Sequence, residues 1–370
     1  MKKVVSIALA LLMVAVMLPV MAMAEGTTLQ SRIDAGETTI TLTENVTESI
    51  TIPKDKTVTL NLNGNTLTNE ANKDTITVAL GGTLTIEGAG TVDNISHGRA
   101  AVYNNGTVTI NGGTYTRSAE KGTGKDPDSN NGNSWYTICN HGVMTVNAGV
   151  TVTNTGTFSS VFENGYQSYT GNNERSNYVA GTNNAAPALT INGGTFEGGK
   201  ITIKNDDGGI LKIGGGRFTN NGNRVVFNAN KAEINGGEFY CPATYFGNEI
   251  AVDTLYADGG QNAGQLTITG GTFDGKVTQS NGAVTTVSGG TFKKGVDKSY
   301  IVDGKKLDAN GNVVPDTITI IVPSEGGSTT TTPSTDNTKN PSTGANDFVG
   351  VAAAMAVVSL LGAAAVIRKK

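Results

Sequence analysis

The chain has 370 residues, a formal net charge of −4 and 16% charged residues, and it contains 50 glycines. An acidic chain of this kind argues against nucleic acid, or another polyanion, as the main partner. Its two histidines and two cysteines have no metal-ligand spacing, so neither a metal site nor a cofactor is expected.

The first 24 residues have the features of a secretory signal peptide. Two lysines precede a long apolar run that ends in Ala22-Met23-Ala24, the small-residue pattern cut by signal peptidases. Cleavage is expected between Ala24 and Glu25, which predicts an exported protein.

From Glu25 to residue 298 the chain repeats one phrase, and Leu-Thr-Ile-Asn-Gly-Gly-Thr-Phe at 189–196 is a clear copy. The second glycine of successive copies falls at residues 90, 113, 149, 194, 216, 237, 271 and 290. Four of the intervals are roughly 22 residues, those of 36 and 34 suggest one unit plus an insertion, and the interval of 45 suggests two units. A phrase repeated at such a period predicts a solenoid.

Each copy predicts one coil of a parallel β-helix. Apolar and polar residues alternate as in a half-buried strand, and glycine pairs supply corners because glycine reaches positive φ. About ten coils at ~4.8 Å each would form a rod about 50 Å long over residues 25–298. Stacking would bring one ring from each of several coils into an internal aromatic column of Tyr115, Phe196, Phe218, Phe239, Phe273 and Phe292.

The Asn-Gly-Gly-Thr-Phe repeats resemble the pectate-lyase-like β-helix repeats of surface proteins from gut Gram-positive bacteria. The opening segments 29–36 and 58–67 are similar to the start of those domains, and the resemblance spans about residues 25 to 300. It implies an all-β fold, a single-stranded right-handed parallel β-helix, and says almost nothing about a ligand.

Three insertions interrupt the repeats, at 117–136, about 163–187 and 240–261. We expect them to emerge on one side of the solenoid, where such proteins usually bind. They hold most of the tyrosines and the single tryptophan, which offer contact area for proteins and stacking faces for sugars. An equal alternative is that these side chains pin long loops onto the rod. The candidate ligand-binding residues are Trp135, Tyr136, Tyr166, Tyr169, Tyr178, Tyr240, Tyr245 and Phe246.

Catalysis has few candidates. Asp206 and Asp207 form the one tight acidic pair, and Arg217 and Arg224 lie one repeat or less downstream. Polygalacturonase-like β-helix enzymes use paired aspartates, and pectate-lyase-like enzymes use an arginine or lysine beside calcium-binding acids. The Gly-His-Gly and Arg-Ile-Lys motifs of the former are missing. An Asp-Asp-Gly-Gly turn is more often a solvated corner, so no catalytic residue is expected.

A disulfide between Cys139 and Cys241 has to be considered because the protein is expected to be exported. Three to four coils would separate them by about 14 to 19 Å, beyond the ~7 Å Cα limit for a bridge. We therefore expect two unpaired cysteines, with Cys139 on a strand and Cys241 near an insertion.

Beyond the coils, residues 299–322 are strand-like, with turn signals at Asp303-Gly304 and Asn310-Gly311, which predicts a small closing β cap. Residues 323–339 are rich in Ser, Thr and Pro and predict a disordered spacer.

Residues 340–370 combine a short motif, an apolar run at 348–367 and a basic tail at 368–370. Twenty apolar residues suffice to cross a bilayer, and the cationic tail would remain cytoplasmic. This order resembles the sorting signal read by sortases, usually Leu-Pro-x-Thr-Gly, although an asparagine replaces the leucine here. The motif residues are Asn340, Pro341, Ser342, Thr343 and Gly344.

The resemblance implies that a transpeptidase cuts between Thr343 and Gly344 and joins Thr343 to peptidoglycan, so that membrane insertion is transient. A plain single-span membrane protein is the alternative. The mature chain would lose five of the 27 Lys and Arg residues and one of the 31 Asp and Glu residues, which leaves a net charge of −8.

Together these features predict a surface protein anchored to the cell wall of a Gram-positive bacterium, an adhesin whose partners include sortase and peptidoglycan. Its ligand could be a host glycoprotein, a mucin glycan or an immunoglobulin. A surface polysaccharide lyase or glycoside hydrolase of the β-helix type is one alternative, and a passive structural spacer is another.

Overall fold

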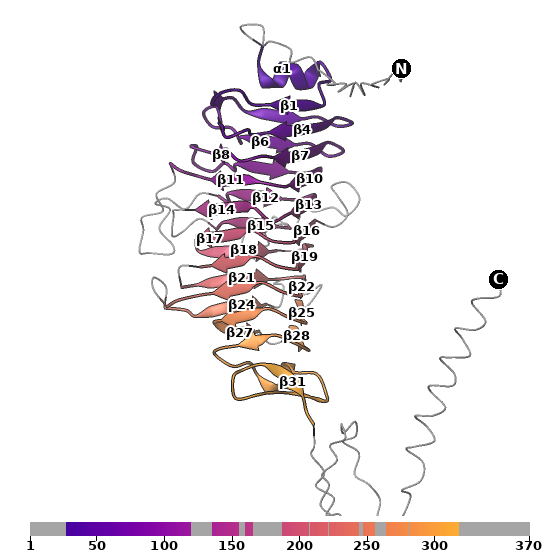
Figure 1. The fold of residues 1–370 in the computed structure, drawn as a ribbon, viewed down its shortest axis with the longest axis vertical. Coiled ribbons are helices and arrows are strands. Elements are labelled where there is room, and N and C mark those ends of the chain that lie inside the picture. The colour runs from indigo at the N-terminus through magenta and orange to yellow at the C-terminus, as the bar shows by residue number, and fades with distance from the viewer. Residues whose placement is uncertain are drawn as a thin grey trace, which may run out of the picture. The chain divides into compact units, whose positions relative to one another are not determined.

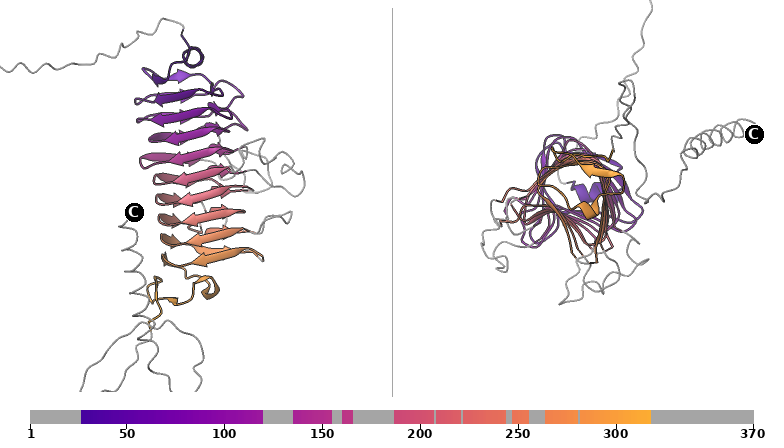
Figure 2. Two further views of the ribbon diagram at one scale, coloured as in Figure 1. Left: turned by 90° about the vertical axis from the view of Figure 1, so that its right-hand side faces the viewer. Right: turned by 90° about the horizontal axis from the view of Figure 1, so that it is seen from below.

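The computed structural model describes residues 27–119, 135–154, 160–165, 187–206, 208–220, 222–243, 247–255, 264–280 and 282–317. In these residues the chain winds into a parallel β-helix, with strands stacked along one axis (Figure 1). Seen along that axis the coils superpose into a ring around a common core (Figure 2). The expected signal peptide and everything after residue 317 lie outside the described residues.

Each coil contributes one strand to each of three parallel sheets, here named A, B and C. Sheet A has ten strands: β1 (Thr39–Thr41), β4 (Thr57–Asn61), β7 (Thr83–Glu87), β10 (Thr107–Ile110), β13 (Val143–Val146), β16 (Ala188–Ile191), β19 (Ile210–Ile213), β22 (Lys231–Ile234), β25 (Gln265–Ile268) and β28 (Val284–Val287).

Sheet B also has ten strands: β2 (Val46–Thr47), β5 (Thr66–Thr68), β8 (Thr91–Asp93), β11 (Gly113–Thr116), β14 (Val150–Asn154), β17 (Thr195–Gly198), β20 (Arg217–Thr219), β23 (Glu238–Tyr240), β26 (Thr272–Asp274) and β29 (Thr291–Phe292). Sheet C has nine: β3 (Ile50–Ile52), β6 (Ile76–Val78), β9 (Val102–Asn104), β12 (Ile138–Asn140), β15 (Phe162–Asn164), β18 (Ile201–Asn205), β21 (Arg224–Asn228), β24 (Ile250–Thr254) and β27 (Lys276–Gln279). The prediction of an all-β parallel β-helix of about ten coils is confirmed.

The repeated phrase forms the corner between sheets A and B. Its first half is the sheet A strand and its Thr-Phe end begins the sheet B strand. The second glycine of the pair adopts positive φ, for example 105° at Gly194 and 101° at Gly237. A side chain would be strained in that conformation, which explains why glycine recurs there.

The aromatic column is present on the inner face of sheet B. Phe196, Phe218, Phe239, Phe273 and Phe292 stack face to face, with ring centroids 4.8–4.9 Å apart. Tyr115 occupies the same register position but is separated from Phe196 by Val152 of the intervening coil. The column is therefore continuous over five coils, and the earlier coils carry Val46, Leu67, Val92, Tyr115 and Val152 at that position.

A buried asparagine ladder follows the turn from sheet C to sheet A. In each of the first four members Nδ2 donates to Oδ1 of the next at 2.7–2.8 Å, and the ladder consists of Asn104, Asn140, Asn164, Asn205 and Asn228. All five side chains are fully buried. Each also donates to the carbonyl of the first residue in a sheet A strand, and that strand belongs to the coil after the one that the asparagine leads into, so the ladder ties successive turns together. The sequence analysis did not predict it.

The longer connections all border sheet C, but they use two corners rather than the single expected one. Residues 117–137 and 241–249 lie between a sheet B strand and a sheet C strand, whereas 165–187 and 255–264 follow a sheet C strand. The segment expected as one insertion at 240–261 in fact contains β24, and the one placed at 163–187 begins inside β15. The 45-residue interval is a single coil with one long insertion, at 165–187, and not two coils.

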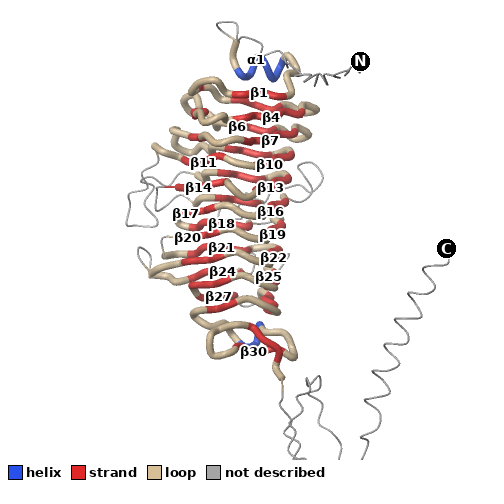
Figure 3. Tube along the Cα trace, viewed as in Figure 1, coloured by secondary structure: helices blue, strands red, loops and turns tan. Residues whose placement is uncertain are grey.

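Both ends of the stack are covered by other elements. The helix α1 (Leu29–Asp34) lies above the first coil (Figure 3). It buries Leu29 and Ile33, and the Glu48 carboxylate accepts hydrogen bonds from its first two N–H groups. After β29, a 3₁₀ turn η2 (Lys298–Tyr300) leads to an antiparallel hairpin of β30 (Lys305–Leu307) and β31 (Val313–Pro315). Isolated bridges at Ile301 and Asn312 join this segment to the last coil.

Both cysteines are free and buried, with Cys139 on β12 and Cys241 just after β23, as expected. No helix of the described residues has the length and apolarity needed to span a membrane. The predicted span at 348–367 and the sorting motif lie outside those residues, and so does the signal-peptide cleavage site.

Candidate functional site

The outer faces of the three sheets differ in chemistry. Over its first six coils sheet A presents a column of threonines in register, formed by Thr39, Thr59, Thr85, Thr109, Thr145 and Thr190. The same column continues with Lys212, Glu233, Thr267 and Thr286. The corresponding outward column of sheet C is instead varied: Tyr103, Cys139, Glu163, Lys204, Phe227 and Asp253. Cys139, Glu163, Lys204 and Asp253 are buried, so only Tyr103 and Phe227 of this column are partly exposed.

A cavity of about 440 Å³ opens at the first part of this face, where the connections before β6 and β9 meet Trp135, three residues before β12. Its size falls within the ~300–1,000 Å³ typical of small-ligand sites. Two aromatic side chains, one carboxylate, one guanidinium and one imidazole are among its lining, which consists of Asn72, Asp74, His97, Gly98, Arg99, Tyr103 and Trp135. We name this cavity the sheet C pocket.

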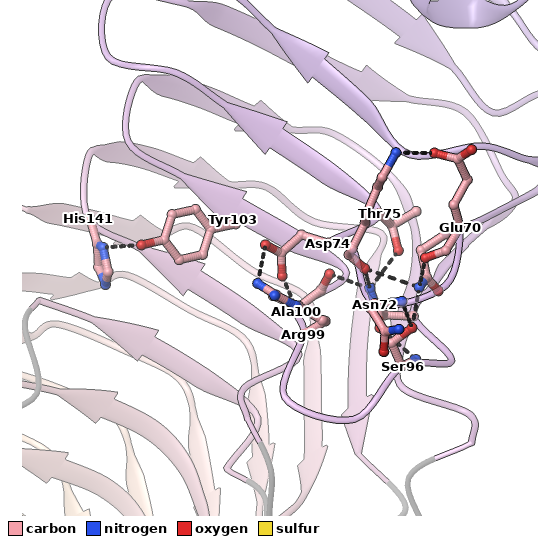
Figure 4. Close-up of polar contacts among 12 residues, drawn as sticks. Glu70, Asn72, Asp74, Thr75, Ser96, Arg99, Ala100, Tyr103 and His141 are labelled. Atoms are coloured by element: carbon pink, nitrogen blue, oxygen red, sulfur yellow. Dashed lines mark hydrogen bonds and ion pairs between the residues drawn. The ribbon is translucent and has the colours of Figure 1, made fainter.

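The two connections that form the pocket are tied together by polar contacts (Figure 4). The backbone N–H of Asn72 donates to Ser96 Oγ at 2.9 Å, and Asn69 Nδ2 donates to the same oxygen at 2.7 Å. Asn94 Nδ2 donates to three oxygens, those of the Lys73 and Ala100 carbonyls and the Thr75 hydroxyl. These bonds hold the walls of the pocket before any ligand arrives, which lowers the entropic cost of binding.

Asp74 is the acidic group of the sheet C pocket. One carboxylate oxygen accepts the Ala100 N–H at 2.6 Å, and the other lies 4.0 Å from Arg99 Nη1. Burial raises the pKa of Asp74, while the Ala100 N–H and the Arg99 and Arg117 guanidinium groups act in the opposite direction. The carboxylate is thus partly desolvated, which strengthens the hydrogen bonds that it accepts.

Arg117 positions the aromatic side of the pocket from behind. Its side chain is fully buried, and its guanidinium donates to the Trp135 carbonyl at 2.8 Å and to the Ser96 carbonyl at 3.2 Å. The Trp135 ring packs edge-to-face on Tyr136, with centroids 5.9 Å apart. Buried contacts therefore hold both the main chain and the ring of Trp135.

A row of ionisable groups continues from the pocket along sheet C. Tyr103 Oη shares a 3.2 Å hydrogen bond with His141 Nδ1 (Figure 4). His141 Nε2 lies 3.7 Å from a Glu163 carboxylate oxygen. Lys204 Nζ then pairs with Asp206 at 2.6 Å and donates to the Tyr136 hydroxyl at 3.1 Å.

Burial lowers the pKa of Lys204, but the negative charges around it outweigh burial and place that pKa well above its usual value. Lys204 is therefore a buried cation neutralised by acidic neighbours, and it is not poised to act as a base.

The structure separates the predicted aromatic candidates. Trp135 lines the sheet C pocket, whereas Tyr136 is only 8% exposed and lies behind it against Lys204. Tyr240 is exposed on sheet B, away from the pocket. The others lie outside the described residues: Tyr166, Tyr169, Tyr178, Tyr245 and Phe246.

The residues considered for catalysis are not brought together. Asp206 is paired with Lys204 at the sheet A end of sheet C, and Arg224 is paired with Asp253 at 2.5 Å at the other end. Arg217 points outward from sheet B, and Asp207 lies outside the described residues. Among the residues that the structure describes, no group of three or more His, Cys, Asp or Glu side chains could hold a metal ion.

Of the seven residues that line the pocket, the sequence analysis selected only Trp135 and missed the other six, which include Asp74, His97, Arg99 and Tyr103. The available signal was positional, because Asn-Lys-Asp at 72–74 and His-Gly-Arg at 97–99 occupy the same connection of successive coils. Polar and charged residues that recur at one connection of neighbouring coils come close together when the coils stack.

No family model, curated protein sequence or solved structure matches this chain.

Proposed function

We propose that this protein is an exported β-helix, tethered to the cell wall, that binds a saccharide in the sheet C pocket. The observation that carries the proposal is the pocket itself, because it combines aromatic faces with charged hydrogen-bonding groups on connections that are already fixed. Trp135 and Tyr103 offer apolar faces to a sugar ring, Asp74 accepts hydrogen bonds from hydroxyls, and Arg99 donates to them.

The proposal is binding rather than cleavage. Asp206 and Arg224 are both engaged in short ion pairs with other side chains, which leaves them poorly placed to share a substrate. Incubation with pectic and mucin polysaccharides should release neither unsaturated nor new reducing ends. Release that is lost in Asp206→Asn would instead support the lyase or hydrolase alternative.

Export and anchoring rest on the termini. The signal peptide, the Asn340–Gly344 motif, the apolar run and the basic tail follow the order of a sortase substrate. This chain is thus proposed to resemble the wall-bound β-helix proteins of gut Gram-positive bacteria. Peptidoglycan digestion should release the protein from cells, and Thr343→Ala should move it to the membrane fraction. An unchanged wall fraction in that variant would contradict anchoring at Thr343.

The binding proposal is tested with the mature chain on an array of host and mucin glycans, alongside immunoglobulin and host glycoproteins. Because Trp135 is the chain's single tryptophan and lines the pocket, a bound sugar should change the protein's tryptophan fluorescence. Arg99→Ala should weaken binding at least tenfold. Lys73→Ala removes an exposed cation paired with Glu70 on the same wall and should leave affinity unchanged. The proposal would be refuted if Arg99→Ala left the affinity for glycans unchanged, or if the protein bound only protein ligands.

A further inference from the structure

The outer face of sheet B changes character along the stack. Its first outward column is threonine in five successive coils, at Thr66, Thr91, Thr114, Thr151 and Thr195. In register after these come Arg217 and Glu238, and threonine then returns at Thr272 and Thr291. Two neighbouring coils thus replace an uncharged polar column with an arginine and a glutamate.

A hollow of about 360 Å³ lies over these two coils. It is lined by Arg217, Glu238, Phe239, Tyr240, Thr272, Asp274 and Lys293. Tyr240 is 44% exposed although it is a large aromatic residue, and it sits between Thr219 and Asp274 in the second outward column. Lys293 Nζ pairs with Asp274 at 3.1 Å and closes one side.

A longer open groove adjoins this hollow and shares Arg217, Glu238 and Thr272 with it. The groove has a volume of about 770 Å³ and follows the stacked glycine corners, past Gly237 and Gly271, to Asn312 of the terminal segment. Together the two spaces cover four strands of sheet B, which is room for more than one sugar ring.

The fold does not need these side chains. Core packing on this strand is provided by Phe239, whereas Tyr240 points away from the core and, among the described residues, its hydroxyl makes no hydrogen bond. Arg217 and Glu238 are neighbours in register, yet within the described part of the chain neither side chain forms an ion pair or hydrogen bond. An exposed aromatic ring beside available charged groups is the composition of a recognition site.

We propose that this hollow is a second saccharide site, independent of the sheet C pocket, that takes a neutral pyranose. The apolar face of the sugar lies on the Tyr240 ring, Arg217 donates to its hydroxyls, and Glu238 accepts from them. The ionic lining is balanced, with two basic and two acidic side chains, so it complements a neutral sugar rather than a sialylated or uronate one.

The two sites lie on different sheets and about five coils apart, which at ~4.8 Å per coil is roughly 24 Å along the axis. One sugar ring cannot occupy both. A protein with two such sites would bind a multivalent glycan surface more tightly than either site alone.

The test uses fluorescence that is specific for each site, in the mature chain. Wild-type emission comes from Trp135 and reports on the sheet C pocket. A variant that combines Trp135→Phe with Tyr240→Trp moves the single reporter to sheet B. Lactose, N-acetyllactosamine, maltose, cellobiose and 3′-sialyllactose are the probes, and calorimetry measures the number of sites.

We expect at least one neutral disaccharide to change the emission of the sheet B reporter. Tyr240→Ala should weaken that calorimetric component at least tenfold while the Trp135 response persists. Thr219→Ala, in the same outward column but outside the hollow, is the matched control and should bind as wild type. Circular dichroism confirms that each variant folds.

If no probe changes the emission of the sheet B reporter while Trp135 still responds, this inference is overturned and the proposed function stands. If the probes change the emission of the sheet B reporter but never that of Trp135 in the wild type, only the proposed function is overturned. Preference for sialyllactose over lactose at the sheet B reporter would overturn the assignment to neutral sugars.

Discussion

Replacing Asn164 with alanine removes a side chain from the middle of the buried asparagine ladder. Its Oδ1 accepts a hydrogen bond from Asn140 at 2.7 Å, and its Nδ2 donates to Asn205 Oδ1 at 2.7 Å and to the Ile210 carbonyl at 3.2 Å. The substitution therefore deprives three polar groups of a partner in a place where Asn164 itself is fully buried.

A buried polar group left without its partner costs about 1–3 kcal/mol. For three groups, and with some access of water to the space vacated by the amide, we expect Asn164→Ala to lower the free energy of unfolding by about 3–5 kcal/mol. Coils gain most of their stability from their neighbours, so the loss should weaken the coils on either side as well.

Asn147 provides a matched control because it occupies the middle of a second, solvent-accessible ladder. It donates to Asn111 and accepts from Asn192, both at 2.8 Å. Water can replace these bonds, so Asn147→Ala should lower the free energy of unfolding by less than about 1 kcal/mol. Urea unfolding of both variants, followed by circular dichroism, measures the difference. Equal losses in the two variants would refute the reasoning from burial.

Three further predictions concern the core, the corners and the thiols. Phe239→Ala should destabilise the protein by about 3–5 kcal/mol in thermal or urea unfolding, because it opens a cavity between two rings stacked at 4.8–4.9 Å; a loss below 1 kcal/mol would contradict the continuous column. Gly289→Ala should lower the melting temperature clearly, since its new Cβ would lie 2.1 Å from a backbone carbonyl oxygen, whereas Gly214→Ala has no atom nearer than 3.8 Å and should be almost neutral. Burial raises the pKa of the Cys139 and Cys241 thiols, so neither should react with a disulfide reagent near neutral pH in the folded protein. Both should react after unfolding, and rapid reaction of the native protein would contradict the burial of the two thiols.

The coil was predictable from sequence because its determinants are local. Alternation of apolar and polar residues sets which side chains face the core, and a glycine pair marks the corner. A single copy such as 189–196 is therefore enough to predict the strands and the corner of a coil. The aromatic column could be predicted because the same position of successive copies carries an aromatic residue. Only Tyr115 is separated from the other rings, by Val152. Register between coils needed no separate information, because a slip of one residue would expose the apolar face.

Insertions were harder to place, since a stretch of about one period can pass for a coil. The interval between Gly149 and Gly194 was interpreted as two units, although among its described residues only Phe162–Asn164 forms a sheet C strand. Without sheet partners in view, three residues of strand are too few to recognise by periodicity. The asparagine ladder was missed for a related reason, because insertions make the spacing between its members irregular.

The sheet C pocket was predicted only in part. Trp135 was selected because it is an aromatic residue in an insertion, and it does line the cavity. Asp74 and Arg99 come from two short connections about one period apart in the sequence, and stacking alone makes them neighbours. The orientation of these two side chains depends on polar contacts between the two connections. Such contacts cannot be recognised in either segment of sequence by itself.

A stack of parallel strands is a template for its own growth, since its last rung offers free N–H and C=O groups to any similar chain. In this protein α1 occupies one end of the stack, and the segment around the β30–β31 hairpin occupies the other. Neither end is left open for a second copy to extend the sheets into a fibril. Many molecules can consequently crowd together and remain separate units, each with a length set by its own coils.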